Sequence, residues 1–280
     1  MKSKILGLAV VPLLGAASLV VVPSCGQPGI NCQTGHGGYA VVYTLKAGSK
    51  QGTGTCDQLT AEIIGLEKYN PAVKGDPMTQ DLEHATIALR SSTVGELSDE
   101  IITTPMAPSV DLSHIDAQGA FTSVDPDAKD VCTIPTLTTE TITVPAFDLK
   151  VSCCTDSSCP MQTPCPDIAS CVMNDCQQPA ISVKYAFSNV RVWVTTAYEG
   201  VIFAGDLTYT DATQGCSASY TMLGLYPLAA CSTDFDCNPI PDMDAGQVVG
   251  SGINPDFASN IRCDKAFGYC VLKAPPDNLK

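Results

Sequence analysis

The sequence has few of the groups on which enzymes usually depend. It contains three histidines, and no serine stands in the G-x-S-x-G pattern that exposes the nucleophile of many hydrolases. A general base needs a partner that positions it, and the sequence identifies none for His36, His84 or His114. We therefore predict that the chain is not an enzyme.

Basic residues are also scarce. The chain has 15 lysines and arginines against 29 aspartates and glutamates, which gives a formal net charge of −14. This charge repels phosphate backbones, and no cluster of lysine and arginine opposes it. Nucleic acid is therefore excluded as a partner, whereas the acidity favours solubility at a surface and attraction of divalent cations.

The cysteines lack the C-x-x-C pairs that zinc, haem and iron–sulfur sites commonly use. Gaps of four or five residues recur in 154–176 instead, and such gaps suit cross-linked loops. A reducing cytosol would keep so many cysteines from pairing. The spacing therefore predicts disulfides and an oxidising compartment.

The first 25 residues have the composition of an export signal. Residues 1–4 form a short basic segment, residues 5–22 carry no charge, and small residues precede Cys25. In this order the segment resembles a bacterial lipoprotein precursor, whose signal ends at a cysteine that becomes lipid-modified. The resemblance implies a lipid on Cys25. Because Gly26 follows rather than aspartate, it also implies sorting to the outer membrane or cell surface.

Two alternatives to a lipid anchor remain open. An ordinary cleaved signal would release a soluble secreted protein. Residues 5–22 are also close to the length that spans a bilayer as an uncleaved helix, although Pro12 weakens such a helix.

The parity of the cysteines agrees with a lipid on Cys25. The chain has 15 cysteines, and one lipidated sulfur leaves an even number that can pair completely. The candidates for disulfides are Cys32, Cys56, Cys132, Cys153, Cys154, Cys159, Cys165, Cys171, Cys176, Cys216, Cys231, Cys237, Cys263 and Cys270.

Short segments rich in β-branched and aromatic residues predict a mainly β fold. The clearest strands outside the central region are 38–47, 85–90 and 136–144. The segment 60–69 is ambiguous between helix and strand, and 105–130 is predicted to be a loop.

One short helix is expected around residues 94–101. Val94, Leu97 and Ile101 fall at helical spacing, with polar residues between them.

The segment 181–226 has the most regular pattern. Apolar and polar residues alternate through it, and turns recur every eight to twelve residues, as in an antiparallel meander. Trp193 falls out of phase with Val190 and Val192. We therefore expect its indole to cover a second core or a loop rather than to bind a ligand.

These patterns divide the chain into four parts. We predict a signal peptide (1–24), a flexible tether (25–37), an antiparallel β-sandwich (38–227) and a small disulfide-stapled C-terminal module (228–280). A cysteine-rich insertion at 153–179 interrupts the sandwich. Because it has almost no apolar core residues, covalent links must order it.

The C-terminal module resembles small disulfide modules of bacterial exported proteins. Cys231 and Cys237 stand in a C-x-x-D-x-D-C pattern, and Cys263 and Cys270 follow with six residues between them. The resemblance implies a structural or binding module rather than a reaction.

Two acidic turns are candidates for a calcium site. Asp125, Asp127 and Asp130 in one turn, and Asp242 and Asp244 in the other, place carboxylates at alternating positions. Neither turn has the bidentate glutamate that closes an EF-hand loop, so solvated turns are the competing interpretation.

Together these features predict an exported lipoprotein, anchored in a membrane by its lipid, with a non-enzymatic structural or binding role at the cell envelope. The expected partner is an envelope protein or a glycan. The alternative is a secreted hydrolase that uses two of the 29 acidic residues as paired carboxylates.

Overall fold

A computed structural model of the chain describes residues 30–103, 107–148, 177–244 and 246–280. The predictions for the signal peptide, for Cys25 and for the six cysteines of 153–176 lie outside these residues. Strands predominate in the part described, which confirms the mainly β prediction.

The elements have the following bounds. The strands are β1 (Gly37–Leu45), β2 (Gln51–Gly52), β3 (Ala61–Tyr69), β4 (Ala72–Val73), β5 (Asp76–Gln80), β6 (Thr86–Ser91), β7 (Ala117–Ala120), β8 (Val131–Thr136), β9 (Glu140–Val144), β10 (Phe147–Asp148), β11 (Gln177–Gln178), β12 (Ile181–Val194), β13 (Glu199–Asp211), β14 (Cys216–Leu225), β15 (Ile261–Asp264) and β16 (Tyr269–Leu272). The α-helix is α1 (Ser92–Thr103), and the 3-10 helices are η1 (Asp234–Cys237), η2 (Pro255–Asn260) and η3 (Asp277–Leu279).

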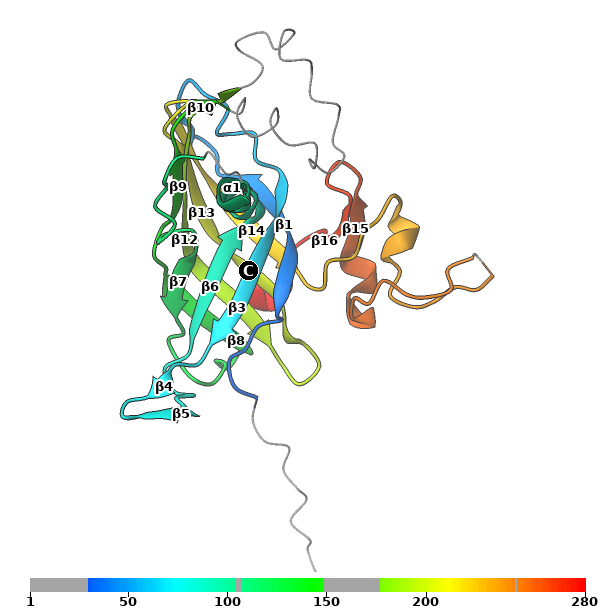
Figure 1. The fold of residues 1–280 in the computed structure, drawn as a ribbon. Coiled ribbons are helices and arrows are strands. Elements are labelled where there is room, and N and C mark those ends of the chain that lie inside the picture. Colours follow the sequence, from blue (N-terminus) through cyan, green and yellow to red (C-terminus); the bar gives the residue numbers. More distant parts are fainter. Residues whose placement is uncertain (1–29, 104–106, 149–176, 245) are drawn as a thin grey trace, which may run out of the picture.

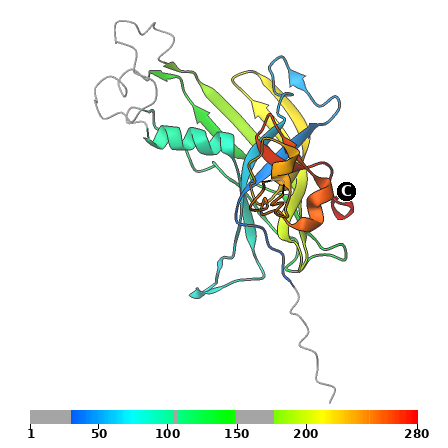
Figure 2. The same cartoon turned by 90° about the vertical axis from the view of Figure 1, so that its right-hand side faces the viewer.

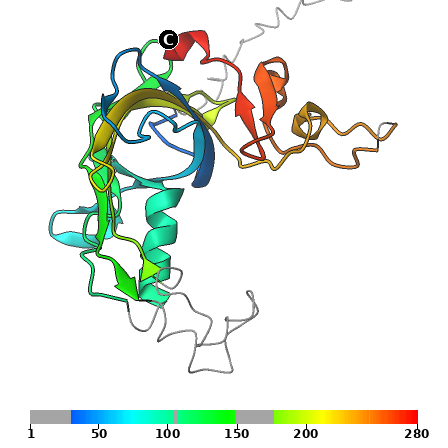
Figure 3. The same cartoon turned by 90° about the horizontal axis from the view of Figure 1, so that it is seen from above.

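Most strands belong to one 10-stranded antiparallel sheet (Figure 1). Its order is β7-β6-β3-β1-β14-β13-β12-β8, with β2 paired to β14 and β9 paired to β12. The sequence predicts a sandwich of two sheets, whereas in the structure a single sheet curls until its ends meet. The amide of Thr122 donates to Thr133 O over 3.0 Å, and the amide of Thr138 donates to Gln118 O over 2.8 Å. Figure 3 shows the curl from above.

The long strand β12 shows how the sequence produces this curl. A β-bulge lies between Ser188 and Arg191, and Asn189 takes a positive φ of 51° there. A bulge bends its strand and shifts the alternation of its side chains by one residue. The buried side chains, three on either side of the bulge, are Val183, Tyr185, Phe187, Val190, Val192 and Val194. The bulge therefore keeps apolar residues on the inner face of a curved strand.

The main core fills the inside of the curled sheet. Helix α1 packs on β3, β6 and β9, and its buried residues are Val94, Ser98 and Ile101. The helix predicted around 94–101 is therefore confirmed.

The structure decides one assignment that the sequence left open and corrects one prediction. The ambiguous segment 60–69 is strand β3, in which Glu62, Ile64 and Leu66 alternate inward. The predicted loop 105–130 contains β7, which pairs with β6 at the end of the sheet. Its sequence, Ala-Gln-Gly-Ala, has no apolar alternation and therefore carries no strand signal.

The C-terminal module packs on the outer face of the same sheet and creates a second core there. This core includes Ile202 and Leu225 from the sheet and Leu272 from the module. Trp193 packs against it, with its ring centroid 6.1 Å from that of Phe257 in η2. The prediction that this indole covers a second core is confirmed.

Four disulfides lie within the described residues: Cys32–Cys132, Cys56–Cys216, Cys231–Cys263 and Cys237–Cys270. The first two tie loop segments to β8 and β14, and the last two lie inside the C-terminal module. These eight cysteines were candidates for disulfides, and the structure supplies the pairing, which the sequence left open.

The aspartates of the C-x-x-D-x-D-C pattern organise the backbone of the C-terminal module. Asp234 Oδ1 accepts a hydrogen bond from the amide of Cys263 over 2.7 Å. Asp236 Oδ2 accepts bonds from the amides of Ser232 and Thr233 over 2.7 and 2.8 Å. The pattern is therefore used for structure.

Candidate functional site

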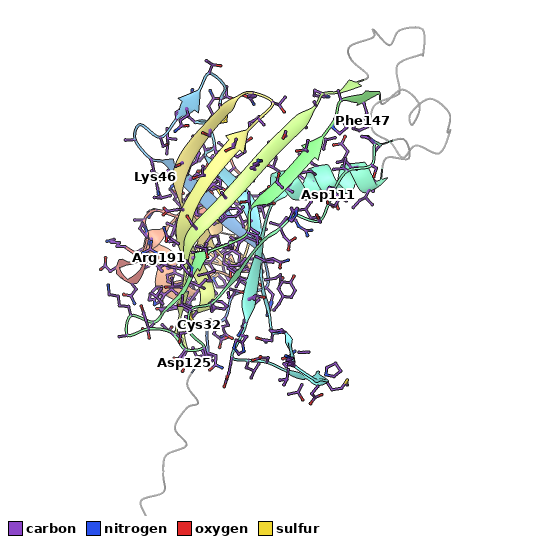
Figure 4. The ribbon with its side chains drawn as sticks, turned by 90° about the vertical axis from the view of Figure 1, so that its left-hand side faces the viewer. Cys32, Lys46, Asp111, Asp125, Phe147 and Arg191 are labelled. Carbon is purple, nitrogen blue, oxygen red and sulfur yellow. A yellow bond between two sulfur atoms is a disulfide. The ribbon has the colours of Figure 1, made fainter. Side chains whose placement is uncertain are left out.

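A groove lies between the outer face of the sheet and the C-terminal module. Its floor consists of residues of β1, β14, β13 and β12. Its wall consists of residues of β15 and β16 and of the residues after β16. Its volume is about 580 Å³, which lies within the range of pockets that hold small ligands. Figure 4 shows Lys46 and Arg191 on this side of the sheet.

Basic side chains gather in this groove although the chain as a whole is acidic. They come from strands far apart in the sequence and from the C-terminal tail. The basic residues that line the groove are Arg191, Arg262, Lys273 and Lys280.

The two aspartates in the groove already have basic partners. Lys46 Nζ lies 2.8 Å from Asp206 Oδ1, and Arg262 Nη1 lies 3.2 Å from Asp264 Oδ2. Partial burial would raise the pKa of Asp206. The hydrogen bonds from Lys46 and Asn189 outweigh burial and hold this pKa below its ordinary value. The charge of Asp206 is therefore balanced mainly by Lys46.

Arg191 has the largest unused capacity for hydrogen bonds in the groove. The other three basic side chains each bond to a protein oxygen. Arg191 is half-buried, and its interaction with the described residues is a charge attraction toward Asp206 without a hydrogen bond. A guanidinium offers five N–H donors in a planar fork that matches a carboxylate or a phosphate. The groove can therefore hold an anionic group at Arg191.

Two carboxylates, Glu62 of β3 and Glu140 of β9, lie buried in the main core. The hydroxyl of Tyr43 donates to Glu62 Oε1, and the hydroxyl of Thr93 donates to Glu62 Oε2 over 3.3 Å. Ser91 donates to Glu140 Oε1 from its amide over 2.9 Å and from its hydroxyl over 3.0 Å. Because Ser91 and Thr93 flank the first residue of α1, the two carboxylates hold the N-terminus of this helix.

Burial raises the pKa of both carboxyl groups. The pKa of Glu62 rises to about 7 and that of Glu140 to about 8, although their hydrogen bonds favour the ionised form. The charge of Glu62 raises the pKa of Glu140 further. Glu140 Oε2 has no hydrogen-bond partner among the described residues, so this group is more stable with a proton.

The buried pair is poorly placed for chemistry on a substrate. Glu140 is 0 % exposed and Glu62 is 8 % exposed, and neither lines the groove. Glycoside hydrolysis needs two carboxylates on either side of an accessible bond. The arrangement instead fastens α1 over the core.

The strands of the curled sheet lie in a region shared with known proteins. A family model described as MlpA matches residues 37–227. The chain belongs to the MlpA family. A protein of Myxococcus xanthus named "Putative lipoprotein MlpA" is 28% identical over 267 residues, which cover 92% of each chain. These findings confirm the resemblance to a bacterial lipoprotein.

The MlpA family model ends at residue 227, where the C-terminal module begins. The groove therefore lies between the region that this model matches and a wall that the model does not include. The similarity to the Myxococcus xanthus protein spans 92% of the chain and so reaches into the module. No solved structure matches the chain. Across the described ranges, no helix has the length and apolar character needed to cross a membrane.

The first acidic turn predicted to bind calcium uses its carboxylates locally. Asp127 Oδ1 accepts hydrogen bonds from the amides of Lys129 and Val131 over 2.8 and 3.0 Å. Asp130 has a positive φ of 63°, and Asp125 is exposed. These contacts give the turn a structural explanation, and calcium binding there stays a prediction.

The second acidic turn is closed by its backbone. Asp242 and Gln247 exchange two backbone hydrogen bonds, of 3.0 and 2.8 Å, and Asp244 is exposed. The aspartates of neither turn form a group of three whose ligand atoms lie within 4.8 Å of one another. In the part of the chain that is described, such a group is formed by Cys231, Cys237 and Cys270, whose sulfurs are committed to disulfides.

The three histidines are exposed. His36 Nδ1 lies 2.7 Å from Glu67 Oε2, and His84 Nδ1 lies 2.8 Å from Asp81 Oδ2. Asp116, two residues after His114, accepts a hydrogen bond from Gln118 over 2.9 Å. None of these three histidines lines the groove.

Neither the groove nor the buried carboxylates were predicted from the sequence. Glu62 and Glu140 did carry a signal, because each stands in phase with buried apolar residues of its strand. Arg191 carried none, since its environment depends on the packing of the C-terminal module.

Proposed function

We propose that this MlpA-family protein is lipidated at Cys25, stands at the outer membrane or cell surface, and binds an anionic envelope glycan without catalysing a reaction. The proposed binding site is the groove beside Arg191. A sugar chain that carries phosphate or carboxylate groups has the chemistry that this groove complements.

The lipid anchor is supported by the allocation of the cysteines. Eight of the 15 cysteines lie within the described residues, and all eight form disulfides, which need an oxidising compartment. Cys25 stands where bacterial lipoproteins carry their lipid, and the similarity to a protein named as a lipoprotein supports the same assignment.

The binding role is carried by one observation, which is the half-buried guanidinium of Arg191 in a groove of about 580 Å³. The alternative, a hydrolase with paired carboxylates, would need Glu62 and Glu140 to reach a substrate. Their burial in the core favours the binding role.

We expect R191A to weaken glycan binding by about 10-fold or more, because a hydrogen-bonded charge pair contributes about 1.5–3 kcal/mol. The probe is the phosphorylated core oligosaccharide of lipopolysaccharide, free of its lipid, and the measurement is isothermal titration calorimetry at low and high salt. Binding by the unmodified protein should weaken as salt increases, since the charges are partly exposed to solvent.

The matched control is K265A. Lys265 is exposed, belongs to the same C-terminal module and does not line the groove, so K265A removes one positive charge elsewhere. It should bind like the unmodified protein. Equal affinity of R191A and K265A, or no binding by the unmodified protein, would contradict the proposed site.

A further inference from the structure

The β4–β5 hairpin carries exposed apolar side chains on a projection from the sheet. Every residue from 71 to 80 is exposed. Met78 is 91% exposed, and Leu82 and Tyr69 are about half exposed. Figures 1 and 2 show the hairpin extending beyond the lower end of the sheet. Apolar side chains gathered on one projection mark an interaction surface.

The carboxylates of the hairpin are engaged with the hairpin itself. Asp76 accepts hydrogen bonds from the amide of Met78 over 3.1 Å and from the hydroxyl of Thr79 over 2.7 Å. Asp81 accepts bonds from the amide of Glu83 over 2.9 Å and from the side chain of His84 over 2.8 Å. These bonds shape the backbone and leave the Met78 side chain free to contact a partner.

The N-terminal segment enters the sheet beside the root of this hairpin. Lys68, near the end of β3, donates from Nζ to Cys32 O over 2.7 Å. Cys32 is also held by its disulfide to Cys132 and by its amide, which donates to Val124 O over 2.7 Å. Figure 4 labels Cys32 near the same end of the sheet. The entry point is therefore fixed next to the hairpin.

The chain between Cys25 and Cys32 and the β4–β5 hairpin can extend over similar distances. Cys25 and Cys32 are seven residues apart, a length of chain that spans at most about 25 Å. The length of the hairpin from Tyr69 to its turn at Gly75 is at most about 20 Å, at about 3.3 Å per residue. A lipid on Cys25 therefore keeps the bilayer surface within reach of the hairpin tip.

We propose that the β4–β5 hairpin is a second contact with the membrane that carries the lipid, with Met78 entering the interface between head groups and acyl chains. This inference rests on the proposed lipidation of Cys25. Two contacts, one through the covalent lipid and one through the exposed Met78 side chain of β5, restrict how the sheet tilts on the bilayer. The groove, which lies on the outer side of the sheet, then faces sideways along the membrane.

The test uses the lipidated full-length protein with the single substitution M78W, reconstituted in phosphatidylethanolamine–phosphatidylglycerol vesicles whose acyl chains carry bromine. Bromine quenches an indole that enters the bilayer, and the emission of Trp193 is subtracted with the unsubstituted protein. The matched control is V249W, because Val249 is 73% exposed and belongs to the C-terminal module beside the sheet. We expect quenching of M78W to exceed that of V249W at least twofold.

Flotation of the vesicles in a density gradient separates this inference from the anchor. If the protein floats, C25S abolishes flotation, and the M78W signal is quenched, both hold. If the protein floats but M78W and V249W are quenched equally, the hairpin contact is wrong and the anchor stands. If the unsubstituted protein does not float, the anchor is wrong and the hairpin contact falls with it.

Discussion

Raising the pH from 5 to 8 is expected to lower the free energy of unfolding by several kcal/mol. Glu62 and Glu140 have pKa values of about 7 and about 8 in the fold, against 4.5 for an unburied glutamate. Between these values the folded protein holds more protons than the unfolded chain, so each rise in pH favours unfolding. The stabilisation by the two protonated carboxyl groups is complete below about pH 4.5 and decreases as the pH rises. It is lost once the pH has passed about 7 for Glu62 and about 8 for Glu140. Urea unfolding followed by circular dichroism at pH 5, 6.5 and 8 measures it.

The substitution E140Q should remove the larger part of this pH dependence. Glutamine keeps an acceptor oxygen for the two bonds from Ser91 and cannot ionise. We expect stability close to that of the unmodified protein at pH 5 and clearly greater stability at pH 8. The control is E100Q, an exposed carboxylate on α1, which should keep the pH dependence unchanged. Stability of the unmodified protein that increases from pH 5 to pH 8 would contradict the buried pair.

Replacing both cysteines of the Cys237–Cys270 disulfide with serine is expected to destabilise the C-terminal module by roughly 2–5 kcal/mol. This disulfide spans 33 residues, and both of its cysteines are buried in the second core. Trp193, the chain's one tryptophan, packs on that core. Its emission should therefore shift to longer wavelength at a lower urea concentration than the circular dichroism of the sheet changes, in non-reducing buffer.

The Cys56–Cys216 disulfide provides the matched control. It lies in the main core and spans 160 residues of the chain. Its removal should destabilise the sheet itself, so the emission of Trp193 and the circular dichroism should change together. Coincident transitions in C237S/C270S would show that the module does not depend on its own disulfide.

Local patterns were sufficient to predict the long strands with alternating side chains but not β7, and not how the strands join. β12, β13 and β14 could be predicted because alternating side chains report one buried face. The pairing of β1 with β14 and the meeting of the sheet's ends depend on segments that are distant in sequence. Buried and exposed side chains alternate in the same way in a sandwich and in a curled sheet, so the sequence could not distinguish these two folds.

The buried carboxylates were predictable in principle. Glu140 precedes Ile142 and Val144 in phase, so a charged side chain on a buried face was visible in the sequence. The groove was not predictable, because Arg191 and Arg262 come together only when the C-terminal module packs on the sheet.

The proposed anchor requires that Cys25 carries lipid while the remaining cysteines are paired. The most direct measurement is mass spectrometry of the protein extracted from bacterial envelopes, alkylated under denaturing, non-reducing conditions. We predict a mature chain that begins at a lipidated Cys25 and whose other fourteen cysteines stay unalkylated. A mature N-terminus without lipid, or alkylation at many cysteines, would contradict this allocation of the cysteines.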